Sequence, residues 1–411
     1  MTKLLIIADD MTGALDSGVM LQARHISTLV QIDSTADIRS VFDHCDVIVV
    51  NTETRHLTAR EAYDRVYHVA RQAVALGIPY LYKKTDSALR GNIGAELQAL
   101  LQAAGADVLH FAPAFPQFNR VTVGGRQLID GLPLDESPFA QDPLNPASSA
   151  YVPDILKAQS TLPVVLDEAV GEEAPYICLH NAQTVEELRG IAEGLLKCGG
   201  GGVFAGCAAF IGEMARYLPI APSEESTVEM SQPLMVFCGS MHEQGRRQIE
   251  AAKRRGIAHY SVEARSAVER SFWRRECGAQ MIADMRQNLA DGEPFVFSVV
   301  GGSEPERYSG EQRDISGKLP PAMAEVIGEV LDGAEGGLPM IIGGDTLGAF
   351  LSHMGARYVR PAGELSPGVV LATYQADGKR KPFVAKAGSF GGDDLLIQII
   401  QNLNLSIKGV V

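Results

Sequence analysis

The chain has 411 residues, of which 46% are hydrophobic and 21% charged, so it can bury a large core and exceeds what one core usually supports. Its formal net charge of -14 and its single Trp argue against a nucleic-acid-binding surface, which needs clustered cations and stacking aromatic side chains. We therefore expect two domains, with a local cationic pocket for any anionic ligand.

The cysteines and the N-terminal segment predict where in the cell the protein resides. The six cysteines form no CxxC pair and have no zinc-site spacing with the nine histidines, so we expect buried thiols in a reducing cytoplasm and no metal site built by the protein. Two acids, Asp9 and Asp10, come too early for a signal peptide, and no apolar run approaches the length that spans a membrane. We expect a cytoplasmic protein that binds neither membranes nor nucleic acid.

The N-terminal half contains short apolar runs that alternate with helical periodicity. Strands are predicted at 4–8, 47–51, 80–83, 108–112, 176–180 and 203–206, and a helix at 185–196. This βαβ pattern is typical of a parallel sheet covered by helices. The proline-rich segment 113–160 is predicted to be an excursion outside the sheet core.

The C-terminal half repeats the α/β pattern. Strands are predicted at 234–238, 295–300, 339–342 and 382–386, each ending in a glycine-bearing turn. A polar, proline-bearing stretch precedes them, so we expect a domain at 1–218, a linker at 219–232 and a second domain at 233–411. The predicted fold is two α/β domains with largely parallel sheets, and an active site in the cleft between them.

Ligands of open α/β sheets bind beyond the carboxyl ends of the strands, so the residues just after each strand are the first candidates. After the first strand, Asp9 and Asp10 could accept a hydroxyl proton, bind a polyol or hold a metal ion. The simpler alternative is that Asp10 or Thr12 only caps the following helix. Because the two acids are adjacent, we expect their side chains to point in different directions, which disfavours an aspartyl-phosphate mechanism.

Cations follow the next two strands. Arg55 could bind a carboxylate in bidentate fashion, or it could be an ordinary salt-bridge arginine. The turn after 80–83 is denser and favours a pocket over a solvated face; its candidate residues are Lys84, Thr85, Asp86, Ser87 and Arg90. Beyond the fourth strand, Arg120 could reach the same ligand or only hold its loop. His110 and His180 lie in strand runs and are expected to be hydrogen-bonded core residues.

Three glycine-bearing turns of the C-terminal half each lead into a predicted helix. Glycine lets backbone N–H groups approach phosphate oxygens, and a helix N-terminus favours negative charge. Together the three turns predict a nucleotide phosphate site made of Ser240, Gly343, Gly344, Asp345, Thr346 and Gly388. Neither GxxxxGK[ST] nor GxGxxG occurs, so a P-loop or a dinucleotide fold of the usual type is disfavoured.

Taken together and in this order, these motifs resemble the four-carbon acid sugar kinase family, which includes D-threonate, D-erythronate and 3-oxo-tetronate kinases. The resemblance covers nearly the whole chain and rests on 8–13, 51–55, 83–94, 239–240, 343–345 and 386–391. It implies an N-terminal domain that binds the sugar acid through Asp9, Arg55 and 84–87, and a C-terminal domain that binds ATP through Ser240, 343–346 and Gly388. Met11, Thr85 and Ser389 depart from residues common in the family and leave the particular substrate open.

The resemblance implies phosphoryl transfer from ATP to a hydroxyl of the acid, the terminal one, with Mg²⁺ brought by the nucleotide. Asp9 or Asp10 is the first choice for the base, and Asp86 and Asp345 are the rivals. A sugar-acid phosphatase, a related enzyme that does not use ATP, and a non-catalytic sensor stay open as alternatives. The stereochemistry of the acid and the assembly are not determined by the sequence; a homodimer is the assembly considered.

Overall fold

A computed structural model describes residues 1–33, 35, 37–142, 145–167, 175–197, 201–223, 233–240, 242–300, 310–332, 336–376 and 378–409. The chain divides into two compact units, Met1–Glu225 and Ser226–Val411. The division falls inside the predicted linker 219–232, of which 224–232 lies outside the described residues, so the predicted domain limits and the interdomain active site stay predictions. Within the described part, no helix is both long enough and apolar enough to span a membrane.

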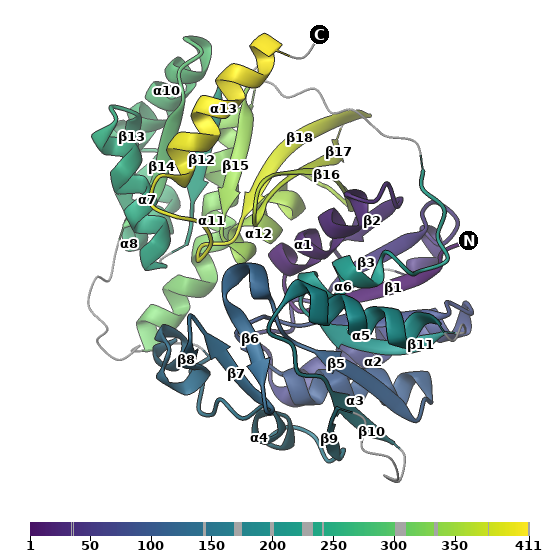
Figure 1. The fold of residues 1–411 in the computed structure, drawn as a ribbon. Helices are drawn as coiled ribbons and strands as arrows, with labels where there is room; N and C mark the ends of the chain where they lie inside the picture. Colours follow the sequence, from purple (N-terminus) through teal and green to yellow (C-terminus); the bar gives the residue numbers. More distant parts are fainter. Residues whose placement is uncertain are drawn as a thin grey trace. The chain divides into compact units, whose positions relative to one another are not determined.

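The first unit is built on a fully parallel sheet (Figure 1). Its strands, in spatial order, are β2 (Thr28–Gln31), β3 (Val47–Asn51), β1 (Leu4–Ala8), β4 (Tyr80–Lys84), β11 (Gly202–Gly206), β5 (Val108–Ala112), β10 (Tyr176–Leu179) and β9 (Val164–Leu166). The central strands β1, β3 and β4 are buried along their whole length; β1 is apolar throughout, whereas β3 ends in Asn51 and β4 ends in Lys83 and Lys84.

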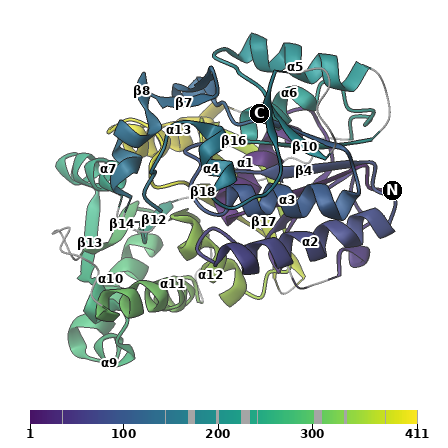
Figure 2. The same ribbon diagram turned by 90° about the horizontal axis from the view of Figure 1, so that it is seen from below.

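Helices cover both faces of this sheet (Figures 1 and 2). One group consists of α1 (Met11–Gln22), α5 (Val185–Lys197) and α6 (Ala208–Met214), and the other of α2 (Ala59–Ala75), α3 (Ile93–Ala104) and α4 (Val152–Lys157). The predicted excursion 113–160 forms a separate antiparallel sheet of β6 (Arg120–Val123), β7 (Arg126–Ile129) and β8 (Leu132–Pro133). Short 3₁₀ helices lie at Ile38–Ser40, Pro116–Phe118, Leu134–Glu136 and Pro138–Gln141.

The second unit has a mixed sheet. Its strands, in spatial order, are β13 (Ala258–Glu263), β14 (Phe295–Val300), β12 (Leu234–Cys238), β15 (Leu338–Ile342), β18 (Lys379–Lys386), β17 (Val369–Ala376) and β16 (Tyr358–Ser366). The first five are parallel, whereas β16, β17 and β18 form an antiparallel meander. The prediction of two helix-covered, largely parallel α/β sheets is confirmed; the meander is the part that it did not foresee.

The helices of the second unit also fall into two groups. An apolar cluster joins the sheet to α7 (Glu243–Arg254) and α13 (Leu395–Gly409), with Ile249, Leu396 and Ile399 among its buried members. The other group comprises α8 (Ala264–Ala267), α9 (Arg270–Trp273), α10 (Glu276–Ala290), α11 (Gly310–Leu331) and α12 (Gly344–His353). Because helices cover both faces of the sheet, polar side chains that bind a ligand are expected at the carboxyl ends of the strands.

Candidate functional site

In the first unit, the parallel register brings three chain turns to one edge of the sheet. Ala8 at the end of β1 is opposite Asn51 of β3 on one side and Lys84 of β4 on the other. The residues that follow these strands therefore lie at the same level, and the backbone N–H of Thr54 donates to the carbonyl of Asp9 at 3.0 Å. Candidate residues as far apart along the chain as Asp9 and Arg90 thus meet at the carboxyl edge of this sheet.

Asp9 and Asp10 converge on one guanidinium. Arg55 Nε donates to Asp9 Oδ2 at 2.7 Å and its Nη1 donates to Asp10 Oδ2 at 2.6 Å, while Nη2 lies 3.6 Å from Asp86 Oδ1. The expectation that the adjacent acids point apart is wrong, because Asp10 is the N-cap of α1 and turns its carboxylate back over the first helical turn. Its Oδ1 accepts the N–H of Gly13 at 2.7 Å, which makes Asp10 the helix cap.

A second carboxylate–guanidinium pair lies beside the first. Arg90 Nε and Nη2 each donate to one oxygen of Asp86, both at 2.9 Å, and Arg90 Nη1 lies 3.3 Å from Asp142 Oδ2. The guanidinium groups of Arg90 and Arg120 both lie 5.2 Å from the ring centroid of Phe139. These contacts hold two cations in fixed positions close to the Arg55 cluster.

Ser87, in the turn after β4, is buried and held by two contacts. The side chain of Arg120 donates to the Ser87 hydroxyl, and the side chain of Gln127 donates to the Ser87 backbone carbonyl at 3.0 Å. Arg120 therefore ties β6 to the turn at Ser87, and its two predicted roles, reaching the ligand or holding its own loop, stay predictions.

Two lysines at the end of β4 point to opposite faces of the sheet, as successive strand residues must. Lys83 Nζ lies 3.1 Å from Glu96 Oε2 of α3, and both side chains are fully buried. Lys84 points toward α1, where a Cβ at position 13 would come within 2.7 Å of its Nζ. Gly13 is therefore required for the close approach of this ammonium group to the helix.

Among the described residues, Asp9 Oδ1 and Thr85 Oγ1 are buried oxygens at this edge without a hydrogen-bond partner; Glu96 Oε2 has none either, but it is paired with the charge of Lys83. The residue exposures are 1% for Asp9 and 0% for Thr85, so neither oxygen is compensated by bulk water. A buried polar atom without a partner costs about 1–3 kcal/mol. Such an atom at the end of a parallel strand needs a partner, which an internal water or a bound ligand would supply.

Neighbouring cations lower the pKa values of two carboxyls in the cluster, Asp10 and Asp86. Burial would raise the pKa of Asp10, but the charges of Arg55 and Lys84 outweigh it, so the pKa lies below its ordinary value. Burial also opposes ionisation of Asp86, yet Arg90 and Arg55 hold the pKa of this carboxyl well below its usual range. Both groups are thus firmly ionised and weakly basic, which makes them poor proton acceptors and good holders of cations.

The second unit brings together its three predicted glycine turns. Cys238, Ile342 and Lys386 end three neighbouring strands at the same level, so the turns after them are adjacent. A Cβ at position 388 would come within 2.1 Å of Ser240 Oγ, and the close approach leaves room only for glycine. The predicted residues of these turns meet: Ser240, Gly343, Gly344, Asp345, Thr346 and Gly388, with Gly343 at φ +113° and Asp345 exposed in the first turn of α12.

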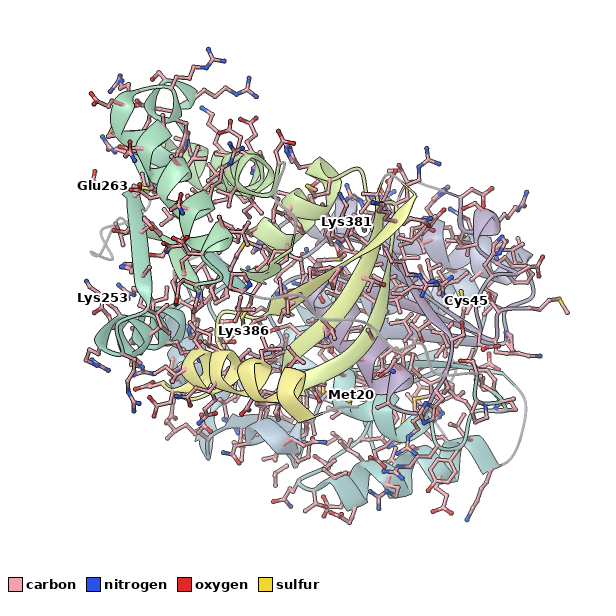
Figure 3. All side chains as sticks on the ribbon, turned by 90° about the horizontal axis from the view of Figure 1, so that it is seen from above. Met20, Cys45, Lys253, Glu263, Lys381 and Lys386 are labelled. Carbon is pink, nitrogen blue, oxygen red and sulfur yellow. The ribbon has the colours of Figure 1, made fainter. Side chains whose placement is uncertain are left out.

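A buried lysine that the sequence analysis left out of the site lies at the start of the third turn. Lys386, which is labelled in Figure 3, is fully buried, and its Nζ donates to the carbonyl of Ala387 at 2.8 Å. Burial, only partly offset by Cys238, lowers its pKa to about 8. The signal that could have found it is a lysine in the last position of a strand, directly before an Ala-Gly-Ser turn.

Other contributors were missed for a different reason. Glu96, Phe139 and Asp142 lie in a helix or in the excursion, and none follows a strand of the sheet. Their contacts with Lys83 and Arg90 span between 13 and 52 positions of the chain, so no local pattern marks them.

Comparisons with known proteins agree with this division into two sites. Residues 4–214 match the family model described as "Sugar-binding N-terminal domain", and residues 235–396 match the one described as "Nucleotide-binding C-terminal domain". Solved structures of a Haemophilus influenzae protein and a Salmonella typhimurium protein have the same fold, with TM-scores of 0.67 and 0.73, each at 19% identity and covering 97% of this chain and 99% and 98% of theirs.

Curated relatives are similar over almost the whole chain. The chain is 28% identical to a D-threonate kinase of Salmonella typhimurium, with 96% of each chain covered, and 28% identical to a D-erythronate kinase of Heliobacterium modesticaldum, with 99% and 98% covered. A 3-oxo-tetronate kinase of Pseudomonas fluorescens is 26% identical, with 97% and 96% covered. The resemblance expected from the motifs is confirmed, and the chain belongs to the four-carbon acid sugar kinase family, in which a sugar-binding N-terminal domain precedes a nucleotide-binding C-terminal domain.

Proposed function

We propose that this kinase transfers a phosphoryl group from ATP to a hydroxyl of a four-carbon sugar acid, the terminal one, to give a 4-phosphate. The observation that carries the proposal is the pair of buried oxygens without partners, Asp9 Oδ1 and Thr85 Oγ1, beside fixed cations. A polyol supplies hydroxyl groups that can donate to both oxygens, and its carboxylate is neutralised by the cations. The names of the curated relatives support a threonate, an erythronate or a 3-oxo-tetronate as the acid.

The proposed roles follow from the contacts of each residue. Arg55 holds Asp9 through one oxygen only, so the other, Oδ1, accepts the proton of the attacking hydroxyl. The new oxygen–phosphorus bond forms as the bond to the leaving ADP breaks. Asp10 and Asp86 keep the guanidinium groups in place, and Lys84, Thr85, Ser87 and Arg90 bind the acid and its hydroxyls, with Arg55 in contact with the carboxylate.

The glycine turns of the second unit fit the phosphates of ATP, because a Cβ at position 239 or 388 would fill the space at their backbone. Mg²⁺ would accompany the nucleotide and neutralise phosphate charge. Asp345, an exposed carboxylate in the first turn of α12, is the residue that would orient it. Ser240, Gly343, Gly344, Thr346 and Gly388 would contact the phosphates.

A coupled assay tests the proposal. Purified protein with ATP and Mg²⁺ should release ADP with D-threonate, D-erythronate or a 3-oxo-tetronate, and not with the three-carbon acid glycerate. Phosphorus NMR of the product locates the phosphorylated oxygen. Binding of an acid without ADP release would favour a sensor, and hydrolysis of a phosphorylated acid without ATP would favour a phosphatase; either result contradicts the proposal.

Gly388→Ala should weaken ATP binding by at least tenfold while leaving sugar-acid binding unchanged. The added Cβ comes within 2.1 Å of Ser240 Oγ and 2.9 Å of its Cβ, so Ser240 has to move out of the turn. Gly363→Ala is the matched control, because the same methyl group there meets no atom within 4 Å. Calorimetry with each ligand measures both affinities. Equal losses of both ligands in Gly388→Ala would contradict the assignment of this turn to the nucleotide.

The affinity for ATP should fall as the pH rises from 7 to 9. The pKa of Lys386 is lowered to about 8, so its side chain carries a positive charge below that pH. Above that pH the charge is lost, and its attraction for phosphate is lost with it. Above pH 8 the affinity for ATP should fall by nearly tenfold per pH unit, because ATP binding then requires the uptake of a proton. Lys386→Met should bind ATP weakly and remove this pH dependence. A wild-type affinity that is flat across this range would refute the role of Lys386.

A further inference from the structure

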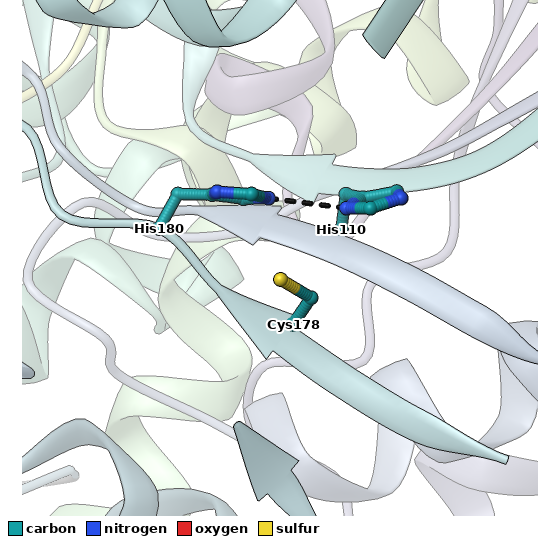
Figure 4. Close-up of side chains that lie close together, drawn as sticks. All are labelled: His110, Cys178 and His180. Atoms are coloured by element: carbon teal, nitrogen blue, oxygen red, sulfur yellow. Dashed lines mark hydrogen bonds between the residues drawn. The ribbon is translucent and has the colours of Figure 1, made fainter. Parts of the chain in front are cut away.

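A cluster of three metal-ligating side chains lies in the first unit, outside the sugar-acid site. His110 Nδ1 and His180 Nε2 are 3.1 Å apart, and the ligand atoms of His110, Cys178 and His180 all lie within 4.8 Å of one another (Figure 4). Cys178 and His180 are buried, with exposures of 1% and 6%. Both histidines are hydrogen-bonded, as predicted, but their contact with each other and the thiol beside them were not foreseen.

Strand geometry explains why the three side chains meet. Cys178 of β10 is directly opposite His110 of β5 in the parallel register, so their side chains are on the same face. His180 directly follows the last residue of β10, and its backbone N–H donates to the carbonyl of Phe111 at 2.8 Å, so the pairing with β5 continues and the period of two returns its side chain to that face. The cluster thus combines Cys178 of β10 and His180 just after this strand with a histidine of the neighbouring strand β5.

We propose that His110, Cys178 and His180 bind a transition-metal ion of the zinc class. Two imidazoles and a thiolate suit Zn²⁺ and related ions, and hard ions such as Mg²⁺ and Ca²⁺ prefer oxygen. With Zn–N near 2.0–2.1 Å and Zn–S near 2.3 Å, two ligand atoms of one tetrahedral ion are about 3.3–3.6 Å apart. The two histidine nitrogens, 3.1 Å apart, are close to this spacing, and the three ligand atoms, which lie within 4.8 Å of one another, would draw closer around an ion.

Metal binding requires each ligand in its metal-binding protonation state. A histidine binds a metal ion as the neutral ring, and a cysteine binds it as the thiolate. The Cys178 thiol loses its proton to solvent when the metal–sulfur bond forms, and one proton is released for each ion bound. Three protein ligands leave the fourth position of a tetrahedral ion to water.

The place of the cluster in the sheet indicates a structural role. Strand β11 separates β5 from β4, so the cluster is not part of the Asp9 and Arg55 site. The ion would join β5 to the end of β10. Two residues after His180, Ala182 pairs with Thr122 of β6. Metal binding is therefore expected to stabilise the first unit against unfolding, since the site is absent in the unfolded chain.

Cobalt spectroscopy tests the proposal on the full chain after treatment with a chelator. Wild-type protein should bind one Co²⁺, with a near-ultraviolet thiolate-to-cobalt charge-transfer band and the visible bands of a four-coordinate ion. Cys178→Ser should remove the charge-transfer band. The affinity of Cys178→Ser for Co²⁺ should fall by more than the roughly 10- to 100-fold that follows loss of a residue that only hydrogen-bonds a metal ligand. The same loss is expected for His110→Gln. Zn²⁺ should raise the melting temperature of wild-type protein and not that of either variant.

Cys277→Ser is the matched control, because Cys277 is an exposed thiol of the second unit and could bind metal adventitiously. This variant should keep the wild-type spectrum. The proposal is overturned if Cys178→Ser keeps the charge-transfer band, if Cys277→Ser loses it, or if wild-type protein shows none at saturating Co²⁺. Because His110 is only partly buried, His110→Gln keeps the test informative if Cys178→Ser does not fold.

Discussion

Asp9→Asn is expected to lower kcat by a factor on the order of 10² to 10⁴ with little change in the affinity for either substrate, because it removes the proposed general base. The amide preserves the shape of the carboxylate and can still accept from Arg55. It cannot take up the hydroxyl proton at Oδ1, the buried oxygen that has no partner among the described residues. Initial rates and calorimetric binding constants for the sugar acid and ATP separate these effects.

The other carboxylates serve as comparisons. Asp10→Asn should mainly lower stability, since both oxygens of Asp10 are engaged by Arg55, Thr12 and the N–H of Gly13. Asp86→Asn should mainly raise the KM for the acid, because it releases Arg90. Asp345→Asn should require more Mg²⁺ for half-maximal rate. If all four variants keep kcat within about threefold of the parent, far below the loss expected for a missing base, the carboxylate mechanism is wrong.

Lys83→Met should lower the free energy of unfolding of the first unit by about 3–5 kcal/mol, because it leaves Glu96 buried without its cation. Burial already raises the pKa of Glu96 against the opposing charge of Lys83, so loss of that charge drives the carboxyl toward its protonated form. Urea unfolding followed by circular dichroism measures the change.

The double variant Lys83→Met/Glu96→Gln should recover most of the lost stability, because it removes the unpaired charge as well. Lys197→Met is the matched control: it breaks the exposed pair with Glu193 on α5 and should leave the unfolding midpoint nearly unchanged. A single Lys83→Met variant as stable as the parent would mean that this buried pair is not required for the fold.

Much of the fold could be predicted because the signals are local. The runs 4–8, 47–51, 108–112, 234–238 and 295–300 are strands with the same limits in the structure, since each is apolar and bounded by turn residues. Other strands were missed: β2 and β9 are short, β13 is polar and β16 is interrupted by Pro and Gly, whereas β17 is a mostly apolar run that was not predicted. The candidate residues after β1, β3, β4, β12, β15 and β18 were found by one rule, that ligands bind beyond the carboxyl ends of parallel strands.

Tertiary structure alone decided which of these residues contact one another. Arg55 was predicted as a substrate cation, but its position between Asp9 and Asp10 depends on the pairing of β1 with β3, which joins residues 46 positions apart. Glu96 compensates Lys83 because α3 packs over β4, and no neighbouring residue in the chain indicates that contact.

The His110, Cys178 and His180 cluster shows the same limit. Only Cys178 and His180 are close in the sequence, and the third ligand is brought by the register of β5 against β10. Secondary structure and turn chemistry thus followed from the amino-acid sequence, because strand length, apolar periodicity and glycine turns depend on adjacent residues. The ion pairs, the unpartnered oxygens and the shifted pKa values depended on strand order and side-chain direction, which arise only when distant segments pack together.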